Sequence, residues 1–204
     1  MNTNYLYDYV TLLERALSFA YKNKYSLDAL QRNISYSPMF LSIEANENDL
    51  GPSIDDKSLI KSLFPDVGYH LEDVPEYNQC LWAAESYLRI QNASSLTFEA
   101  IFLYIPIKAM YDYFSVYHEM DFSQIINRFF ELYNSQSVLS LLLRKYGYSV
   151  KKVSEMVNIP YDTLQSLKSR RRNIAKISVD AALSLSRLFN VRIETITEQR
   201  LFNN

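Results

Sequence analysis

A cluster of basic side chains lies in the C-terminal third of this 204-residue chain, in the segment KSRRRN. Its cations are Lys168, Arg170, Arg171 and Arg172, whereas the chain as a whole carries a formal net charge of −2. Ammonium and guanidinium groups bind phosphates through charge-assisted hydrogen bonds. We therefore expect these four residues to contact the phosphates of a polyanion.

The charge of the chain is unevenly distributed. Residues 1–143 contain nine Lys and Arg against eighteen Asp and Glu, and residues 144–204 contain twelve against five, so the two segments have net charges of −9 and +7. This asymmetry indicates that the shorter segment binds a polyanion and the longer one does not. The alternative is that the acidic and basic segments attract each other within one fold.

Two short helices with a tight turn between them are predicted beside the basic cluster. Ser149 caps the first helix, which contains VKKVSEMV, and the second contains PYDTLQSLK. Asn158 stands at the turn, and asparagine is the non-glycine residue that best tolerates a left-handed backbone. A sharp corner between two such helices, with polar residues outside on the second, is the arrangement that inserts a helix into the major groove of DNA.

Apolar residues recur along both helices at the spacing that places them on one face. The residues expected to be buried are Val153, Met156, Val157, Ile159, Leu164 and Leu167. Ser154 is small, which allows the two helices to cross closely. The polar residues left on the outer face are Tyr161, Asp162, Gln165, Ser166 and Lys168.

Residues 141–196, from LLLRKYGYS to LFNVRIETI, resemble the lambda-repressor-like (Xre/Cro-type) helix-turn-helix domain. The resemblance covers about a quarter of the chain and implies a five-helix domain, which we place at residues 137–204, with a further helix capped by Ser178. It also implies binding to double-stranded DNA. By position, the resemblance assigns base contacts to Tyr161, Asp162, Gln165 and Ser166, and phosphate contacts to Ser149, Lys151, Lys168 and Arg172.

Residues 1–136 form a second predicted domain, which is acidic, rich in aromatic residues and all-helical. The whole chain has only three glycines and six prolines, which are too few for a β-protein built on tight turns. Helix boundaries, caps and breaks are expected at Pro65, Pro75, Ser94 or Ser95, Pro106, and Asp121 with Gln124. This segment resembles the accessory domains of bacterial and phage regulators and antitoxins, which dimerise, sense a ligand or hold a partner protein.

The sequence offers no candidate for catalysis or metal binding. Cys80 is the single cysteine and is accompanied by only two histidines, so no zinc-type ligand spacing exists. There is no Ser/His/Asp grouping and no glycine-rich phosphate loop. His118 and Glu119 lack the second histidine that a metal-binding helix needs. We therefore predict no enzymatic activity, no metal and no cofactor.

The predicted function is a sequence-specific, DNA-binding transcriptional regulator of bacterial or phage type. It would act as a homodimer on a palindromic site, with residues 1–136 making the dimer. The alternative is a protein-interaction module, such as an antitoxin or a phage-encoded inhibitor, in which residues 1–136 bind a partner protein and the helix-turn-helix domain is secondary. Because no signal peptide and no membrane-length apolar run is evident, we expect a cytoplasmic protein that makes no membrane contact.

Overall fold

The structure is a computed structural model, which describes residues 3–45, 56–64 and 78–198. These residues form thirteen α-helices and one short 3-10 helix, and they contain no strand. The expected all-α fold class is therefore confirmed. None of the described helices combines the length and the apolar character that a membrane span requires.

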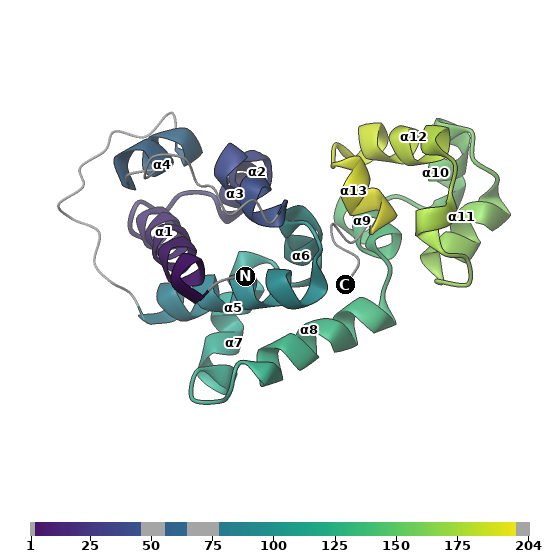
Figure 1. The fold of residues 1–204 in the computed structure, drawn as a ribbon. Helices are drawn as coiled ribbons and strands as arrows, with labels where there is room; N and C mark the ends of the chain where they lie inside the picture. The colour runs from purple at the N-terminus through teal and green to yellow at the C-terminus, as the bar shows by residue number, and fades with distance from the viewer. Residues whose placement is uncertain (1–2, 46–55, 65–77, 199–204) are drawn as a thin grey trace.

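Eight of the described helices make up the N-terminal part of the fold. They are α1 (Thr3–Lys22), α2 (Leu27–Tyr36), α3 (Pro38–Glu44), α4 (Asp56–Leu63), α5 (Asn78–Ser94), α6 (Phe98–Tyr104), α7 (Ile107–Tyr117) and α8 (Ser123–Ser135). Helix α1 packs along α5, and α7 and α8 also contact α5, while α2 packs on α6. Figure 1 shows α8 running along the base of this group.

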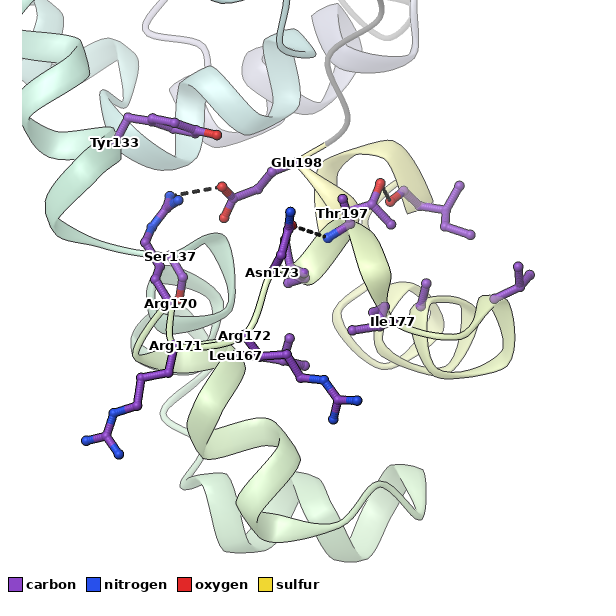
Figure 2. A pocket seen from close by; sticks show the side chains of 15 residues that line it. Tyr133, Ser137, Leu167, Arg170, Arg171, Arg172, Asn173, Ile177, Thr197 and Glu198 are labelled. Carbon is purple, nitrogen blue, oxygen red and sulfur yellow. Dashed lines mark hydrogen bonds and ion pairs between the residues drawn. The ribbon is translucent and has the colours of Figure 1, made fainter.

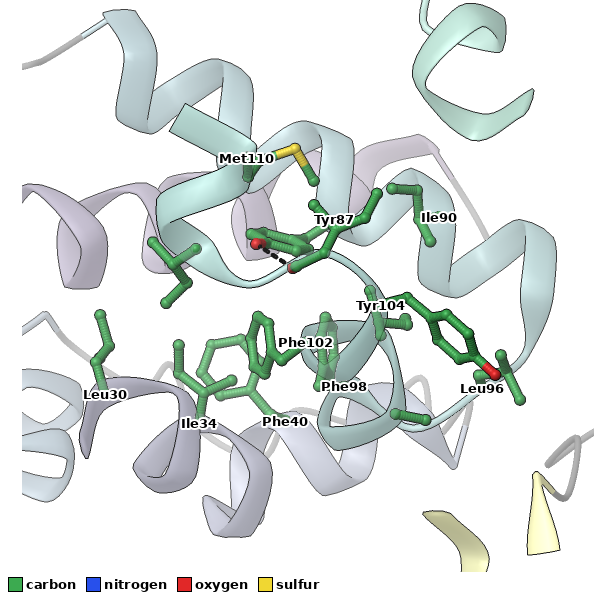
Figure 3. Close-up of a cluster of buried hydrophobic side chains, with 14 of the residues drawn as sticks. Leu30, Ile34, Phe40, Tyr87, Ile90, Leu96, Phe98, Phe102, Tyr104 and Met110 are labelled. Atoms are coloured by element: carbon green, nitrogen blue, oxygen red, sulfur yellow. Dashed lines mark hydrogen bonds between the residues drawn. The ribbon is translucent and has the colours of Figure 1, made fainter. Parts of the chain in front are cut away.

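Aromatic and aliphatic side chains of α2, α3, α5 and α6 fill a common core (Figure 3). Tyr87 of α5 is fully buried there, and its ring meets that of Phe102 edge-on with the centroids 5.0 Å apart. The Tyr87 hydroxyl donates a hydrogen bond of 2.8 Å to the carbonyl of Ile105, just after the end of α6. The helix cannot continue past this point because Pro106 lacks an N–H, so the break expected at Pro106 is confirmed.

The other four boundary predictions have different outcomes. The cap expected at Ser94 or Ser95 is wrong, because Thr97 caps α6 by accepting from the Ala100 N–H at 3.1 Å. The helix expected after Asp121 is confirmed as α8, but the capping box expected of Asp121 with Gln124 is wrong, because Phe122 is the N-cap and the Asp121 carboxylate accepts from the Ser123 N–H at 2.8 Å. The boundaries expected at Pro65 and Pro75 lie outside the described residues.

The remaining helices follow α8 after a break of two residues. They are α9 (Val138–Tyr146), α10 (Val150–Val157), α11 (Tyr161–Lys168), the 3-10 helix η2 (Ile174–Lys176), α12 (Val179–Phe189) and α13 (Ile193–Thr197). Ser137, Ser149 and Ser178 cap α9, α10 and α12, and each side chain accepts a backbone N–H at 3.1 to 3.3 Å. The caps expected at Ser149 and Ser178 are therefore confirmed. In Figure 1 these helices form a group beyond the end of α8.

Candidate nucleic-acid interface

Helices α10 and α11 meet at a tight turn, residues 158–160. Asn158 ends α10 with φ at 52°, in the left-handed conformation expected of it. The Ile159 side chain is buried, and the Ser154 hydroxyl donates to the Ile159 carbonyl at 2.6 Å. Ser154 therefore ties the turn back to α10. The small size of Ser154 had indicated only a close helix crossing, so this hydrogen bond is an additional role.

The inner faces of α10 and α11 are apolar. Val153, Leu164 and Leu167 are buried, as expected, and α11 packs against both α9 and α10. The prediction that Met156 is buried is wrong, because half of its surface is exposed. The buried stripe of α10 passes through Val150 and Val153, and Met156 lies beside it.

The outer face of α11 carries the residues expected to contact DNA bases. Tyr161, Gln165 and Lys168 are exposed and lie at helical spacings of four and three, so they form one stripe along the helix. Asp162 is also exposed and Ser166 is half-buried, and both lie beside this stripe. The structure thus brings all four candidate base-contacting residues to one side of α11.

The start of α10 presents two of the candidate phosphate contacts. Ser149 is exposed, and its oxygen accepts from the Lys152 N–H at 3.1 Å, which leaves the hydroxyl hydrogen available to another acceptor. Lys151 is exposed as well. The neighbouring Lys152 places its ammonium group 4.6 Å from the centroid of the Tyr148 ring, a distance at which a cation and an aromatic face attract.

The three consecutive arginines after α11 do not share one environment. Figure 2 shows Arg171 extending away from the rest of the fold and Arg172 extending toward the space between α11 and α12, and both are exposed. Arg170 turns the opposite way, and its guanidinium donates to Glu198 at 2.9 Å. This placement does not suit the phosphate contact expected of Arg170, because the group is already occupied within the protein.

Contacts between the N-terminal and C-terminal helices involve several residues that sequence reasoning missed. Arg192, at the start of α13, donates to the buried carboxylate of Glu44 at 2.5 Å. The Glu99 carboxylate accepts from the Arg192 N–H at 2.8 Å and from the Thr195 hydroxyl at 2.7 Å. No local signal could have revealed these pairs, since Glu44 and Arg192 are 148 positions apart.

A second set of cross-contacts surrounds Tyr104 of α6. Its hydroxyl accepts from Arg170 at 2.9 Å and donates to the Gln136 carbonyl at 3.2 Å. Burial, followed by the nearby Glu198 carboxylate, raises the pKa of Tyr104, so the hydroxyl remains protonated at neutral pH. Tyr104 is therefore a neutral hydrogen-bonding partner in this cluster.

A cavity of about 940 Å³ lies between the loop after α11 and helices α12 and α13 (Figure 2). The residues that line it include Leu167, Ile177, Ile193, Arg170 and Glu198. Within the part of the chain that the structure describes, no three His, Cys, Asp or Glu side chains are grouped so that they could hold a metal ion.

Comparison of the chain with protein-family models, with curated proteins and with solved structures finds no match.

Proposed function

We propose that this protein is a sequence-specific, DNA-binding transcriptional regulator of bacterial or phage type, with α11 as the helix that enters the major groove. The observation that carries the proposal is the exposed polar stripe of Tyr161, Gln165 and Lys168 on a short helix whose opposite face is buried. The tight turn at Asn158 sets α11 against α10 in the order typical of helix-turn-helix proteins.

The proposed base contacts follow from the hydrogen-bonding capacity of each side chain. Gln165 can form two hydrogen bonds with adenine, and Tyr161 can contact a thymine methyl group or donate to a base edge. Asp162 can accept from the amino group of cytosine, and the Ser166 hydroxyl can serve either as donor or as acceptor. Each well-formed contact of this kind contributes about 1–3 kcal/mol of discrimination between bases.

The proposed phosphate contacts lie at two places on the same pair of helices. Ser149 and Lys151 lie at the start of α10, the helix that crosses the backbone in this type of complex. Lys168, Arg171 and Arg172 lie at and beyond the end of α11. These cations make no ion pair with another described residue, so they are available to a polyanion.

The dimer expected on a palindromic site would use the N-terminal helices. Two copies of α11 must lie about 34–36 Å apart to occupy successive half-sites of DNA. Helix α7 fully buries only Ile107 and Met110, and beyond them Val116 and Met120 are at least half exposed. Exposed apolar groups of this kind are common at protein interfaces. The same surface also suits a partner protein, which is the basis of the second candidate function, an antitoxin or inhibitor.

The test of this function begins with selection of DNA from a randomised duplex pool on the full-length protein. We expect a palindromic consensus and, by light scattering, a dimer. Replacing both Arg171 and Arg172 with Ala should weaken binding to every sequence and reduce the log–log salt slope by about one unit per lost phosphate contact. The matched control is Lys61→Ala with Lys108→Ala, which removes the same charge from exposed sites on α4 and α7.

Two outcomes would count against the proposal. If no sequence is enriched, α11 does not contact bases selectively, and the protein-interaction function gains support. If the Arg171 and Arg172 variant and the Lys61 and Lys108 control have the same salt slope, the basic loop lies away from DNA.

A further inference from the structure

Arg170 differs from the two arginines that follow it in the direction of its side chain. Its φ is 56°, so the backbone enters the left-handed region two residues after the end of α11. Its side chain is only 30% exposed. An exposed arginine gains nothing from such a conformation, which is costly for a residue with a Cβ atom. The contacts that the side chain makes must therefore offset this cost.

The guanidinium of Arg170 has four partners. It donates from Nε to the Gln136 carbonyl at 2.9 Å, and from Nη2 to the Tyr104 hydroxyl and to the Glu198 carboxylate, each at 2.9 Å. Its central carbon lies 4.6 Å from the centroid of the Tyr133 ring. Tyr104 belongs to α6 and Tyr133 to α8, so the loop after α11 is bonded directly to the N-terminal helices.

Glu198 joins the same cluster to the start of α9. Its Oε2 accepts from Arg170, and its Oε1 accepts from the Val138 N–H at 2.9 Å. Val138 is the first residue of α9, where a carboxylate satisfies a free N–H and interacts favourably with the helix dipole. Glu198 is almost fully buried. The Arg170 and Glu198 pair is therefore held on both sides by backbone groups.

A second bond holds the end of α11 itself. The Ser137 hydroxyl donates to the carbonyl of Lys168, the last residue of α11, at 2.9 Å. The same oxygen accepts from the Ser140 N–H and so caps α9. Only Gln136 and Ser137 separate α8 from α9, and each makes one of these contacts. The connection between α8 and α9 thus contacts both α11 and the loop that follows it.

We infer that Arg170 is a positioning residue, which fixes the end of α11 and the adjacent Arg171 and Arg172 relative to α6 and α8. This inference rests on the proposed function and adds that the recognition helix and the N-terminal helices act as one rigid unit. In a dimer made by the N-terminal helices, the Arg170 contacts set the distance and angle between the two copies of α11. A shift of α8 on binding another molecule would move the basic loop directly.

The decisive variant is Arg170→Lys. Lysine keeps the positive charge, so a simple phosphate contact would survive, but its single ammonium group cannot bond to Gln136, Tyr104 and Glu198 in the geometry of the guanidinium fork. The matched control is Arg171→Lys in the exposed neighbour. A second variant, Glu198→Gln, removes the charge of the partner and keeps an oxygen for the Val138 N–H.

The first measurement is amide hydrogen exchange on the full-length protein without DNA. We expect faster exchange at residues 165–173 in Arg170→Lys and in Glu198→Gln, and exchange equal to that of the wild type in Arg171→Lys. The second measurement is affinity for the best duplex recovered by selection and for a scrambled duplex. Both Arg170→Lys and Glu198→Gln should lose about tenfold in affinity for the selected duplex, and less for the scrambled one. The double variant should lose less affinity for the selected duplex than the sum of the losses in the two single variants.

The two measurements separate failure of the inference from failure of the proposed function. If Arg170→Lys has the same amide exchange rates and the same DNA affinity as the wild type, Arg170 is not a positioning residue. Faster exchange with unchanged affinity would show the contact but overturn its effect on DNA binding. If the wild-type protein selects no duplex, the proposed function is wrong, and so is the effect of Arg170 on DNA binding. The exchange measurement would still test whether Arg170 holds the loop after α11.

Discussion

Replacing Arg192 with Met should destabilise the protein strongly. The Glu44 carboxylate is 1% exposed and has two hydrogen-bond donors, the Arg192 guanidinium at 2.5 Å and the Phe98 N–H at 2.6 Å. Removal of one partner from a buried ion pair costs about 3–5 kcal/mol. Because the Phe98 N–H remains, we expect a loss of about 3 kcal/mol. For a chain of this size, the melting temperature should fall by about 6–12 °C.

The stability lost in Arg192→Met should also depend on pH. Burial raises the pKa of Glu44 above its ordinary value, although the Arg192 guanidinium and the Phe98 N–H act in the opposite direction. A raised pKa means that the folded state binds this proton more tightly than the unfolded state. The stability contributed by Glu44 is therefore full below the ordinary pKa of 4.5 and is lost as the pH rises through the folded pKa. Without Arg192 this pKa rises further, so the gap between variant and wild type should widen from about pH 5 to about pH 7.

Urea denaturation and thermal melts at both pH values would measure this effect. The control is the double variant Glu44→Gln with Arg192→Met, because glutamine is uncharged and can still accept from the Phe98 N–H. The double variant should regain most of the lost stability, and its remaining deficit should not vary with pH. If the single variant has the midpoint of the wild type, or loses equally at both pH values, Glu44 is not a buried charge that depends on Arg192.

Two further predictions concern the recognition helix and its turn. Replacing Gln165 with Ala should relax the preference at one base pair by about 1–3 kcal/mol and leave nonspecific affinity nearly unchanged, as measured on duplexes with single substitutions. Equal preference before and after the change would mean that α11 does not contact bases through this residue. Replacing Asn158 with Ala should lower the free energy of unfolding by about 1 kcal/mol, because its φ is 52°, whereas Asn158→Gly should cost less. Equal losses in urea denaturation would indicate that the side chain matters more than the backbone conformation.

The local features of the C-terminal helices could be predicted from the sequence because each depends on a few neighbouring residues. Ser149 and Ser178 cap helices through bonds to amides three positions on. Asn158 takes the left-handed conformation that its short polar side chain tolerates. The burial of Leu164 and Leu167 follows from helical spacing alone. Met156 shows the limit of this reasoning, because spacing does not define the width of the buried stripe.

The contacts that orient these helices could not be predicted, because they join distant parts of the chain. In the segment KSRRRN the three arginines look alike, and only the fold places Arg170 beside Tyr104 and Glu198. The separation of Arg170 from Tyr104 is 66 positions. Likewise, the bond of Ser137 to Lys168 depends on how α9 and α11 pack. Residue type predicts the kind of interaction, whereas the partner depends on tertiary structure.

The charge asymmetry of the chain has two competing explanations, which are contact with a polyanion and attraction between the two segments within the fold. Arg192 forms a partly buried pair with Glu44 and so joins the basic segment to the acidic one, whereas Arg170 pairs with Glu198 within the basic segment. Both arginines are used within the fold, but only the pair of Arg192 with Glu44 is what attraction between the two segments predicts.

Pairs within the fold do not account for the outward-facing cations. Lys151, Lys168, Arg171 and Arg172 are exposed, and none of them makes an ion pair with another described residue. Attraction between acidic and basic segments would draw such side chains toward the N-terminal helices, where the acidic residues are concentrated. They lie instead at the start of α10 and at and beyond the end of α11. The position of these cations on the same pair of helices as the polar stripe of α11 is the reason that we favour DNA over an acidic protein surface as the partner.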